Sequence, residues 1–484
     1  MDSNSIKKIV KLTSFIGLVL ALFFLIPIVV GYIYNEDIKA LAIFDGLYFL
    51  FNILILLFLR KSVLQMSIKE AVLAVNVVWL LLGVVGGSAL YVGSNISFAS
   101  AFFEAISGFT TTGATIYTNL EILPNYLLML RSLMHWIGGM GIIVLGVGLL
   151  SFINPTGSMA MFKSESTGIS VEKMTPKIKD TAIRLWGIYL FLTILDATLL
   201  KIGGMSLFDA INHAFSTIST GGFSTKNSSM GYWENNYFIL WITTIFMFLS
   251  GINFLAHLKF LQGEIDGYLS QEVKWYFYIF IFLSLSLALV HIYYDKSDFD
   301  SSMTHSFFTI SSIITTTGFA STDYSKWSNF AVAFIFIPMF IGANAGSTAG
   351  GVKVIRYLVL FKNLIAQLKL IIYPNAVVNI FIDKKKISSN IVSKVSAFFV
   401  LYMITVLLLS FYLFTRDYDF LTSFSASIAV IGNIGPGFGH VGPAENFSIF
   451  SNFDKIVLSI FMIIGRLEFF TFIIIFTKSF WKKF

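Results

Sequence analysis

The chain has 484 residues, of which 56% are hydrophobic and 12% are charged, with a mean hydropathy of +0.81. Soluble domains carry about 25% charged residues, so this composition cannot cover a water-facing surface and excludes soluble enzymes, nucleic-acid-binding proteins and disordered scaffolds. The formal net charge of +7 is then interpreted as loop charge that orients a membrane protein, and the lack of cysteine excludes disulfides and thiolate chemistry.

Apolar runs that are long enough to cross a bilayer recur along the whole sequence. The first run has no small-residue cleavage site after it, so we expect a retained helix and not a signal peptide. With a requirement of about 20 apolar residues per span, the sequence predicts about ten spanning helices. They lie at 14–34, 41–59, 71–92, 125–150, 182–202, 237–258, 275–294, 328–360, 395–414 and 455–477.

Four shorter and more polar segments lie between these runs, at 98–109, 207–219, 302–315 and 420–431. Each has about 12 residues, which is too short to span a bilayer. Lysine and arginine are concentrated in the loops on the side of both termini, so the positive-inside rule predicts that both termini are cytoplasmic. The four short segments then lie on the outer side and are predicted to be re-entrant helices.

A related glycine-containing stretch follows each short segment, at 110–114, 219–223, 315–319 and 432–436. These stretches recur at intervals of roughly 100 residues, which predicts four copies of a helix, re-entrant segment, helix unit. The predicted division is 1–69 for two extra N-terminal helices, then repeats at 70–180, 181–270, 271–386 and 387–484. The expected fold is an all-α polytopic membrane protein.

Irregular backbone at membrane depth is tolerated only where protein buries it or where it lines a water-filled path. Around a shared axis, backbone carbonyls could replace the water shell of a cation, and glycine permits the backbone conformations that this requires. The absence of a carboxylate ring argues against a calcium filter. The alternative for a single copy is close helix packing on small residues. The predicted ion-coordinating residues are Thr111, Thr112, Gly113, Thr220, Gly221, Gly222, Thr316, Thr317, Gly318, Asn433, Ile434 and Gly435.

Two features in the later spans depart from lipid-facing helices. The eighth span contains Gly342 and a Gly/Ser/Thr cluster at 346–351, which indicates a broken helix; the alternative is a flexible helix packed on a neighbour. Arg466 lies within the last span, where a buried cation is expected to have a function. Glu468 is two residues away and points elsewhere on a helix, so the partner of Arg466 must come from another segment.

Other polar residues inside the spans are Asp196, His135, Asn212 and His213. They are predicted to form hydrogen bonds between helices and not a proton relay, since no chain of acids and histidines connects them. The 437–442 stretch matches G-x-G-x-x-G, but it follows a predicted pore segment and lacks the strand and helix of a dinucleotide site. No nucleotide site is expected in this chain.

The sequence resembles the pore subunits of the Trk/Ktr/HKT potassium transporter superfamily over essentially its whole length. The resemblance is carried by the four glycine stretches and by three further motifs, at 135–141 (HWIGGMG), 346–351 (GSTAGG) and 465–468 (GRLE). With its two extra N-terminal helices, the chain resembles the pore subunits of the Trk branch more than the shorter ones of the Ktr branch. Plant relatives that prefer sodium have a similar pattern with serine in place of the first filter glycine. This sequence has glycine at all four filter positions, and the resemblance therefore implies selectivity for K⁺.

The resemblance implies potassium uptake across a bacterial inner membrane through a pseudo-fourfold carbonyl filter, with K⁺ as the transported ion and no organic cofactor. It implies a gate of two parts: an intramembrane loop and Arg466 beneath the filter. The gate residues are Gly346, Ser347, Thr348, Gly350, Gly351 and Arg466.

The resemblance also implies a homodimer in membrane lipid, docked on a cytoplasmic TrkA-type nucleotide-binding regulatory subunit, with no nucleic acid partner. The basic loops around 163–179 and 362–386 are candidate contact surfaces for that subunit. The alternative function is an ion-coupled (H⁺ or Na⁺) secondary potassium symporter, which predicts inverted repeats, whereas the four copies here run parallel. A membrane enzyme would need clustered acids or histidines, and the sequence has none.

Overall fold

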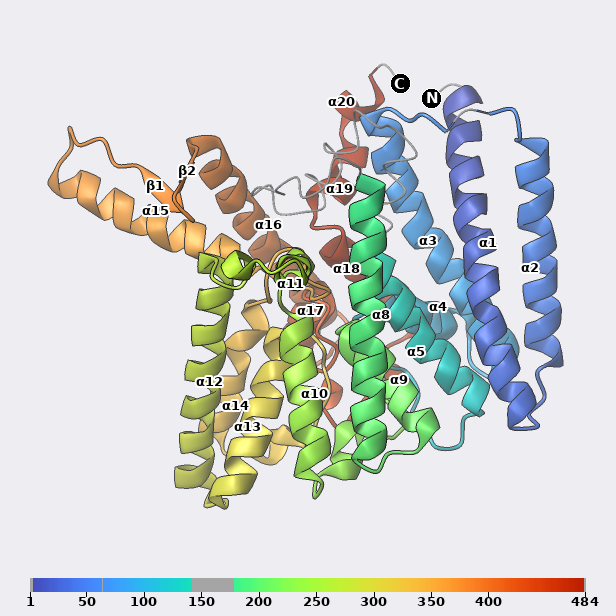
Figure 1. Ribbon diagram of the computed structural model, residues 1–484, viewed down its shortest axis with the longest axis horizontal. Helices are drawn as coiled ribbons and strands as arrows, with labels where there is room; N and C mark the ends of the chain where they lie inside the picture. The colour runs from blue at the N-terminus through green and yellow to red at the C-terminus, as the bar shows by residue number, and fades with distance from the viewer. Residues whose placement is uncertain (1–2, 63, 142–177, 483–484) are drawn as a thin grey trace.

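The computed structural model describes residues 3–62, 64–141 and 178–482, and these form one helical bundle (Figure 1). Both ends of the chain lie at the same end of the bundle. The helices are α1 Ser3–Ile33, α2 Lys39–Phe58, α3 Ile68–Gly93, α4 Phe98–Phe109, α5 Asn125–Met140, α8 Ile178–Ile202, α9 Leu207–Ile218, α10 Tyr237–Ser250, α11 Phe254–Leu261, α12 Gln271–Asp295, α13 Phe299–Ile314, α14 Asn329–Phe336, α15 Val354–Ile372, α16 Ser389–Phe414, α17 Phe420–Ile431, α18 Asn452–Arg466, α19 Phe470–Ile473 and α20 Lys478–Trp481.

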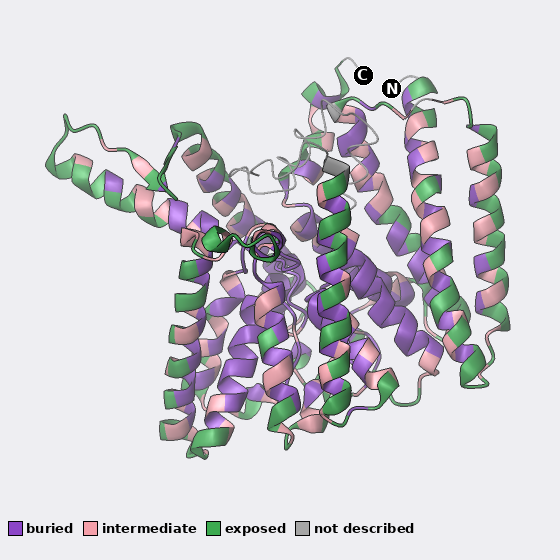
Figure 2. Ribbon diagram, in the orientation of Figure 1, coloured by how far each residue is buried: buried purple, intermediate pink, exposed green. Residues whose placement is uncertain are grey.

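The outer helices expose apolar side chains, as lipid-facing helices do. Phe58 is 87% exposed and Leu47 is 64% exposed on α2. Among the described residues, six helices are long and apolar enough to cross a membrane by themselves, namely α1, α2, α3, α8, α12 and α16. Figure 2 shows exposed faces on these outer helices around a buried centre. An apolar exterior of this kind is stable only in a bilayer.

Two further spans are bent, which corrects the prediction of about ten continuous helices. The run predicted at 237–258 is α10 followed by α11, with a 95° bend between them. The run predicted at 455–477 is α18 followed, after a 112° bend, by α19 and a 3-10 turn. With each bent pair counted as one span, the described residues contain up to eight spans. The prediction of a span rests on the length and the hydropathy of an apolar run, and neither quantity depends on whether the helix is bent.

The run predicted at 328–360 is not one helix. It consists of α14, a 3-10 turn at Pro338–Phe340, an irregular stretch at 341–353 and the start of α15. Helix α15 continues well past the predicted end and projects from the bundle (Figure 1). The expected break is therefore confirmed, but it is longer than the 346–351 cluster.

A small hairpin interrupts the otherwise helical chain. Strands β1 Ile380–Ile382 and β2 Lys385–Ile387 pair antiparallel, with Ile380 opposite Ile387. The turn between them has positive φ at Asp383 and Lys384. The predicted all-α class holds for the bundle, and the hairpin packs against the first half of α15, where Ile382 and Ile387 share an apolar cluster with Leu358 (Figure 1).

The four predicted short segments are the helices α4, α9, α13 and α17, which end within a residue of the predicted positions. They lie in the buried centre of the bundle (Figure 2). Three of them start with a side-chain cap: Ser97, Ser206 and Asp419 each accept a hydrogen bond from an amide three residues later. Such caps satisfy amides that the first helical turn leaves free. We call these helices the pore helices.

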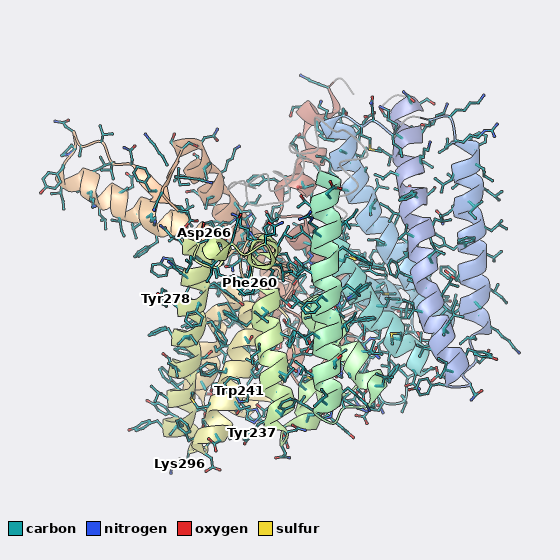
Figure 3. All side chains as sticks on the ribbon, viewed as in Figure 1. Tyr237, Trp241, Phe260, Asp266, Tyr278 and Lys296 are labelled. Carbon is teal, nitrogen blue, oxygen red and sulfur yellow. The ribbon has the colours of Figure 1, made fainter. Side chains whose placement is uncertain are left out.

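Aromatic side chains mark the ends of the outer helices. In Figure 3, Tyr237 and Trp241 lie toward one end of α10, with Lys296 at the corresponding end of α12, and Tyr278 lies nearer the opposite end. Tyr237 is 39% exposed and Tyr278 is 61% exposed. Tyrosine and tryptophan favour the two membrane–water interfaces, so these positions indicate the membrane boundaries.

Candidate ion pathway and gate

The four pore helices end in the same hydrogen-bonded turn. In each copy, an amide just past the helix donates to a carbonyl five residues earlier. These pairs are Thr112 N to Ser107 O (2.9 Å), Gly221 N to Ser216 O (2.8 Å), Thr317 N to Ser312 O (2.8 Å) and Ile434 N to Ala429 O (2.8 Å). The partial negative charge of each helix C-terminus is therefore directed to the glycine stretch that follows.

The glycine stretches share one backbone conformation. In each, a non-glycine residue with positive φ is followed two positions later by a glycine with positive φ. The non-glycine residues are Thr111 (+52°), Thr220 (+54°), Thr316 (+56°) and Asn433 (+52°), and the glycines are Gly113 (+81°), Gly222 (+83°), Gly318 (+81°) and Gly435 (+99°). L-residues seldom adopt such angles, so four matched pairs show that the copies are structurally equivalent. We call these four stretches the filter segments.

The filter segments form a closed ring. A Cβ atom added to any of the four glycines would come within 3.0 Å of a backbone carbonyl oxygen in the next segment. Gly113 faces the oxygen of Gly221, Gly222 that of Thr317, Gly318 that of Ile434, and Gly435 that of Thr112. The order runs from the first copy through the fourth and back to the first. Backbones this close admit only glycine.

The fourth segment, which lacks the threonine pair, joins the ring through a side chain. The Asn433 amide nitrogen donates to the Thr112 hydroxyl (2.9 Å) and to the Met462 carbonyl (3.1 Å). In the first and third segments, hydroxyls pair within one segment, with Thr110 and Thr112 2.7 Å apart and Thr315 and Thr317 also 2.7 Å apart. The fourth segment is thus linked to the first through a side-chain amide.

The 341–353 loop lies directly against three of the four filter segments or the pore helices before them. The Gly350 amide donates to the Thr316 hydroxyl (2.6 Å), and the Thr348 hydroxyl donates to the Ile218 carbonyl at the end of α9 (3.1 Å). A Cβ on Gly350 would meet the Gly432 carbonyl. The loop therefore lies at the end of the filter ring where the pore helices finish. This is the position that the family resemblance implies for a gate.

Arg466 also contacts this loop. It is the last residue of α18 and not a mid-helix residue as predicted, and its Nη1 donates to the Thr348 carbonyl (3.0 Å). Its side chain is buried, and its Nε and Nη2 have no hydrogen-bond partner among the described residues. The partner does come from another segment, as expected.

Two charged residues next to the loop, Lys353 and Arg356, were not singled out from the sequence, and Glu468 was considered there only as a partner of Arg466. Glu468 pairs with Arg356 of α15 at 2.5 Å, and the Lys353 ammonium donates to the carbonyls of Ala349 and Gly350. A signal was present, because Lys353 and Arg356 interrupt an otherwise apolar run. These residues hold the base of the loop.

The polar side chains predicted to bond between helices do so only in part. His135 Nδ1 bonds to the Gly108 carbonyl of α4 at 2.7 Å, which confirms the prediction for this residue. Asn212 donates to Phe208 of its own helix, so that prediction is wrong. His213 bonds to Asp209 of its own helix and to Ser224. Asp196 lies beside Thr217 without a hydrogen bond.

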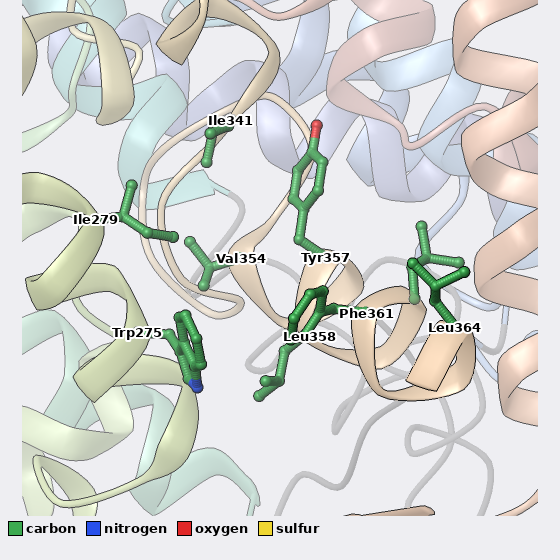
Figure 4. A pocket seen from close by; sticks show the side chains of 9 residues that line it. Trp275, Ile279, Ile341, Val354, Tyr357, Leu358, Phe361 and Leu364 are labelled. Carbon is green, nitrogen blue, oxygen red and sulfur yellow. The ribbon is translucent and has the colours of Figure 1, made fainter. Parts of the chain in front are cut away.

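An apolar pocket of about 520 Å³ lies between α12 and α15, beside both ends of the 341–353 loop (Figure 4). Its lining includes Trp275, Ile279, Ile341, Val354 and Phe361. Tyr357 contributes a hydroxyl, but this group donates to the Phe340 carbonyl. The pocket offers no charge to a cation, so it does not form part of the candidate ion pathway.

Known proteins share this sequence and this fold. A family model described as cation transport protein, TrkH, matches residues 39–285 and 276–483. The Trk system potassium uptake protein TrkH of Vibrio parahaemolyticus is 37% identical, with 97% of this chain and 98% of that protein aligned. The corresponding protein TrkG of Escherichia coli strain K12 is 33% identical over the full length of both chains.

The fold comparison agrees. The crystal structure of the potassium transporter TrkH from Vibrio parahaemolyticus superposes with a TM-score of 0.89, covering 99% of this chain and all of that one. The resemblance drawn from the sequence motifs is confirmed, and the relatives are transporters and not enzymes. The chain belongs to the TrkH family of cation transport proteins.

Proposed function

We propose that this protein conducts K⁺ into bacterial cells across the inner membrane, through the ring of four filter segments. The relatives named above are potassium uptake proteins, which supports K⁺ as the transported ion. The orientation has both termini in the cytoplasm, in keeping with their position at one end of the bundle and with the lysine-rich loops. The repeats run from 70–180, 181–270, 271–386 and 387–484, after two N-terminal helices at 1–69.

The observation that carries this proposal is the closed ring of carbonyl and glycine contacts. Four backbones approach one another around one axis, and each presents a carbonyl next to a glycine of its neighbour. Carbonyl oxygens at such a ring replace the hydration shell of a cation. The coordinating residues are those of the four filter segments: Thr111–Gly113, Thr220–Gly222, Thr316–Gly318 and Asn433–Gly435.

The gate is formed by the 341–353 loop, with Gly346, Ser347, Thr348, Gly350 and Gly351 in its path-facing part, and by Arg466. The loop blocks the path because it contacts three copies at once, and Arg466 adds a positive charge that repels a cation. A homodimer and a cytoplasmic nucleotide-binding subunit that moves the loop complete the proposal. The Lys362–Lys386 region is a candidate docking surface, whereas Lys163, Lys173 and Lys177 lie outside the described residues.

Bi-ionic measurements on the purified protein in liposomes test this function. With K⁺ on one side and Na⁺ on the other, the reversal potential should follow the K⁺ gradient and should not shift when a pH gradient is imposed. Rb⁺ should substitute for K⁺ because the two ions differ little in radius. Equal permeation of K⁺ and Na⁺ would reject the filter.

A shift of the reversal potential with the pH or Na⁺ gradient would favour the coupled symporter. That alternative has little structural support in the described part of the chain. Asp196 and His213 both lie against Thr217, but the Thr217 hydroxyl donates to the His213 backbone carbonyl and not to its ring. His135 bonds elsewhere, to the Gly108 carbonyl, so no chain of titratable side chains connects the three among the described residues. The discontinuous helices belong to parallel repeats and not to inverted ones.

A further inference from the structure

The stretch after each filter glycine is tied to its own pore helix by a polar side chain. Because the chain leaves the filter through these stretches, we call them the outlet segments: 114–117, 223–225, 319–321 and 436–438. The contacts are Ile116 N to Glu104 (2.8 Å), Ser224 Oγ with His213 Nε2 (2.9 Å), Ser312 Oγ to the Phe319 carbonyl (2.7 Å) and Phe438 N to Ser425 Oγ (2.8 Å). A glutamate, a histidine and two serines thus each tie one outlet segment to its own pore helix.

The first copy uses a buried charge for this task. Glu104 of α4 is completely buried, and the Arg131 side chain of α5 is 1% exposed. Arg131 Nε donates to Glu104 Oε1 at 2.8 Å, and the Thr115 hydroxyl donates to the same oxygen at 2.9 Å. A buried carboxylate requires a partner of this kind, because an unpaired one is strongly destabilising. The sequence signal for this pair is two opposite charges inside predicted membrane segments, Glu104 in the short segment at 98–109 and Arg131 in the span at 125–150.

Arg131 reaches beyond its own copy. Its Nη2 donates to Thr115 in the first outlet segment (3.1 Å), and its Nη1 donates to the Ser224 carbonyl in the second (3.2 Å). Its guanidinium carbon lies 4.1 Å from the centre of the Phe223 ring, directly after Gly222. One planar cation therefore sets the distance between two neighbouring outlet segments, which a point charge such as lysine cannot do.

We propose that Glu104 and Arg131 form a positioning pair that fixes the relative placement of the first two filter segments and thereby sets the selectivity for K⁺ over Na⁺. Both residues act through the outlet segments and do not touch the ion. The carboxylate neutralises the guanidinium, so the pair adds no barrier to a cation. This inference rests on the proposed filter function.

The test is the K⁺ to Na⁺ permeability ratio in liposomes, which does not depend on the amount of protein reconstituted. Arg131→Lys keeps the positive charge but loses the planar guanidinium, whose several N–H groups donate to both outlet segments at once. We therefore expect the permeability ratio to fall about tenfold. Thr115→Val, which removes one shared hydroxyl at nearly constant volume, should lower it about threefold. Arg416→Lys alters an ion pair with Asp454 away from the filter and should leave the ratio unchanged.

A neutral double variant separates positioning from simple stability. Glu104→Gln with Arg131→Met leaves no unpaired buried charge, so the yield of monodisperse protein should return toward that of the wild type, while the permeability ratio stays low. A wild-type ratio in this double variant, or in Arg131→Lys, would overturn the proposal. If Arg131→Lys does not fold, the double variant and Thr115→Val decide, and wild-type ratios in both would overturn it.

Gly113→Ser distinguishes this inference from the filter itself. If Gly113→Ser lowers the ratio and the double variant does not, the positioning pair is wrong and the filter stands. If Gly113→Ser also leaves the ratio unchanged, the filter assignment fails, and the positioning pair fails with it.

Discussion

The filter segments and the 341–353 loop are both irregular backbone buried in the bundle, but they are held in different ways. The filter segments repeat one conformation four times and fit glycine against neighbouring carbonyls with no room for a Cβ. The loop occurs once, and side chains hold it: the Thr316 hydroxyl, the Glu272 carboxylate and Arg466.

Buried polar atoms without a hydrogen-bond partner among the described residues occur in both regions, including Thr111 Oγ1 and Asn433 Oδ1 in the filter segments. Both side-chain amide atoms of Asn344 in the loop, and two nitrogens of Arg466, have no hydrogen-bond partner among the described residues. Buried polar groups without partners are costly, so these atoms lower the stability of both regions. The comparison therefore separates a ring held by close backbone fit in four copies from a single loop held by side-chain contacts.

The largest expected effect comes from filling space in the ring. Gly222→Asp should reduce K⁺ flux by more than about a hundredfold, because its Cβ would displace the Thr317 carbonyl and its charge would bind a cation too tightly to release it. The measurement is K⁺ flux in liposomes at matched protein content. Gly263→Asp is the matched control, since Gly263 has a similar φ of +86° and nothing within 4 Å of an added Cβ. Equal losses in both variants would mean that backbone strain, and not crowding in the ring, causes the effect.

The next effect has the opposite sign and belongs to the loop. Arg466→Ala should raise basal K⁺ flux about tenfold, because it removes both the contact with Thr348 and a positive charge near the path. Deletion of 345–350 should raise basal flux at least as much. The double variant should match the more open single variant, as expected for contacts that stabilise one closed state.

Additive effects in that double variant would instead indicate two independent barriers. Reduced flux in both single variants would mean that loop and arginine are structural supports and not a gate. Arg416→Ala, which removes an arginine on the opposite side of the filter from Arg466, should leave basal flux unchanged.

The smallest expected effect lies where the ring departs from fourfold symmetry. Asn433→Ala removes hydrogen bonds to Thr112 and Met462 and should lower stability by about 2 kcal/mol, with a modest loss of K⁺ selectivity. Thermal unfolding in detergent and the permeability ratio measure the two effects. Asn212→Ala is the control, because its amide donates within its own helix. Unchanged selectivity in Asn433→Ala would show that the fourth segment needs no side-chain link.

The sequence predicted the parts of this protein that depend on local pattern. The pore helices ended where polar, small-residue segments met the repeated glycine, because four copies reinforced one weak signal. The filter glycines were predictable for the same reason. Positive φ at a glycine is a local requirement, and each copy shows it.

What the sequence could not predict depends on contacts between distant segments. The runs at 237–258 and 455–477 have the hydropathy of straight spans, yet both bend sharply. The partner of Arg466 is a backbone carbonyl 118 positions away. Every residue has such a carbonyl, so the sequence does not indicate which one Arg466 contacts. Glu104 and Arg131 are opposite charges 27 positions apart, and their pairing depends on how α4 packs against α5.

If four equivalent glycines form one K⁺-selective ring, replacing each of them by serine in turn tests that ring most directly. Gly113→Ser, Gly222→Ser, Gly318→Ser and Gly435→Ser, one at a time, should each lower the K⁺ to Na⁺ permeability ratio in liposomes, while Gly263→Ser should not. The effect should appear at Gly435 as well, because its Cβ would approach the Thr112 carbonyl to 2.6 Å. A wild-type ratio in two or more of the four ring variants would contradict the account.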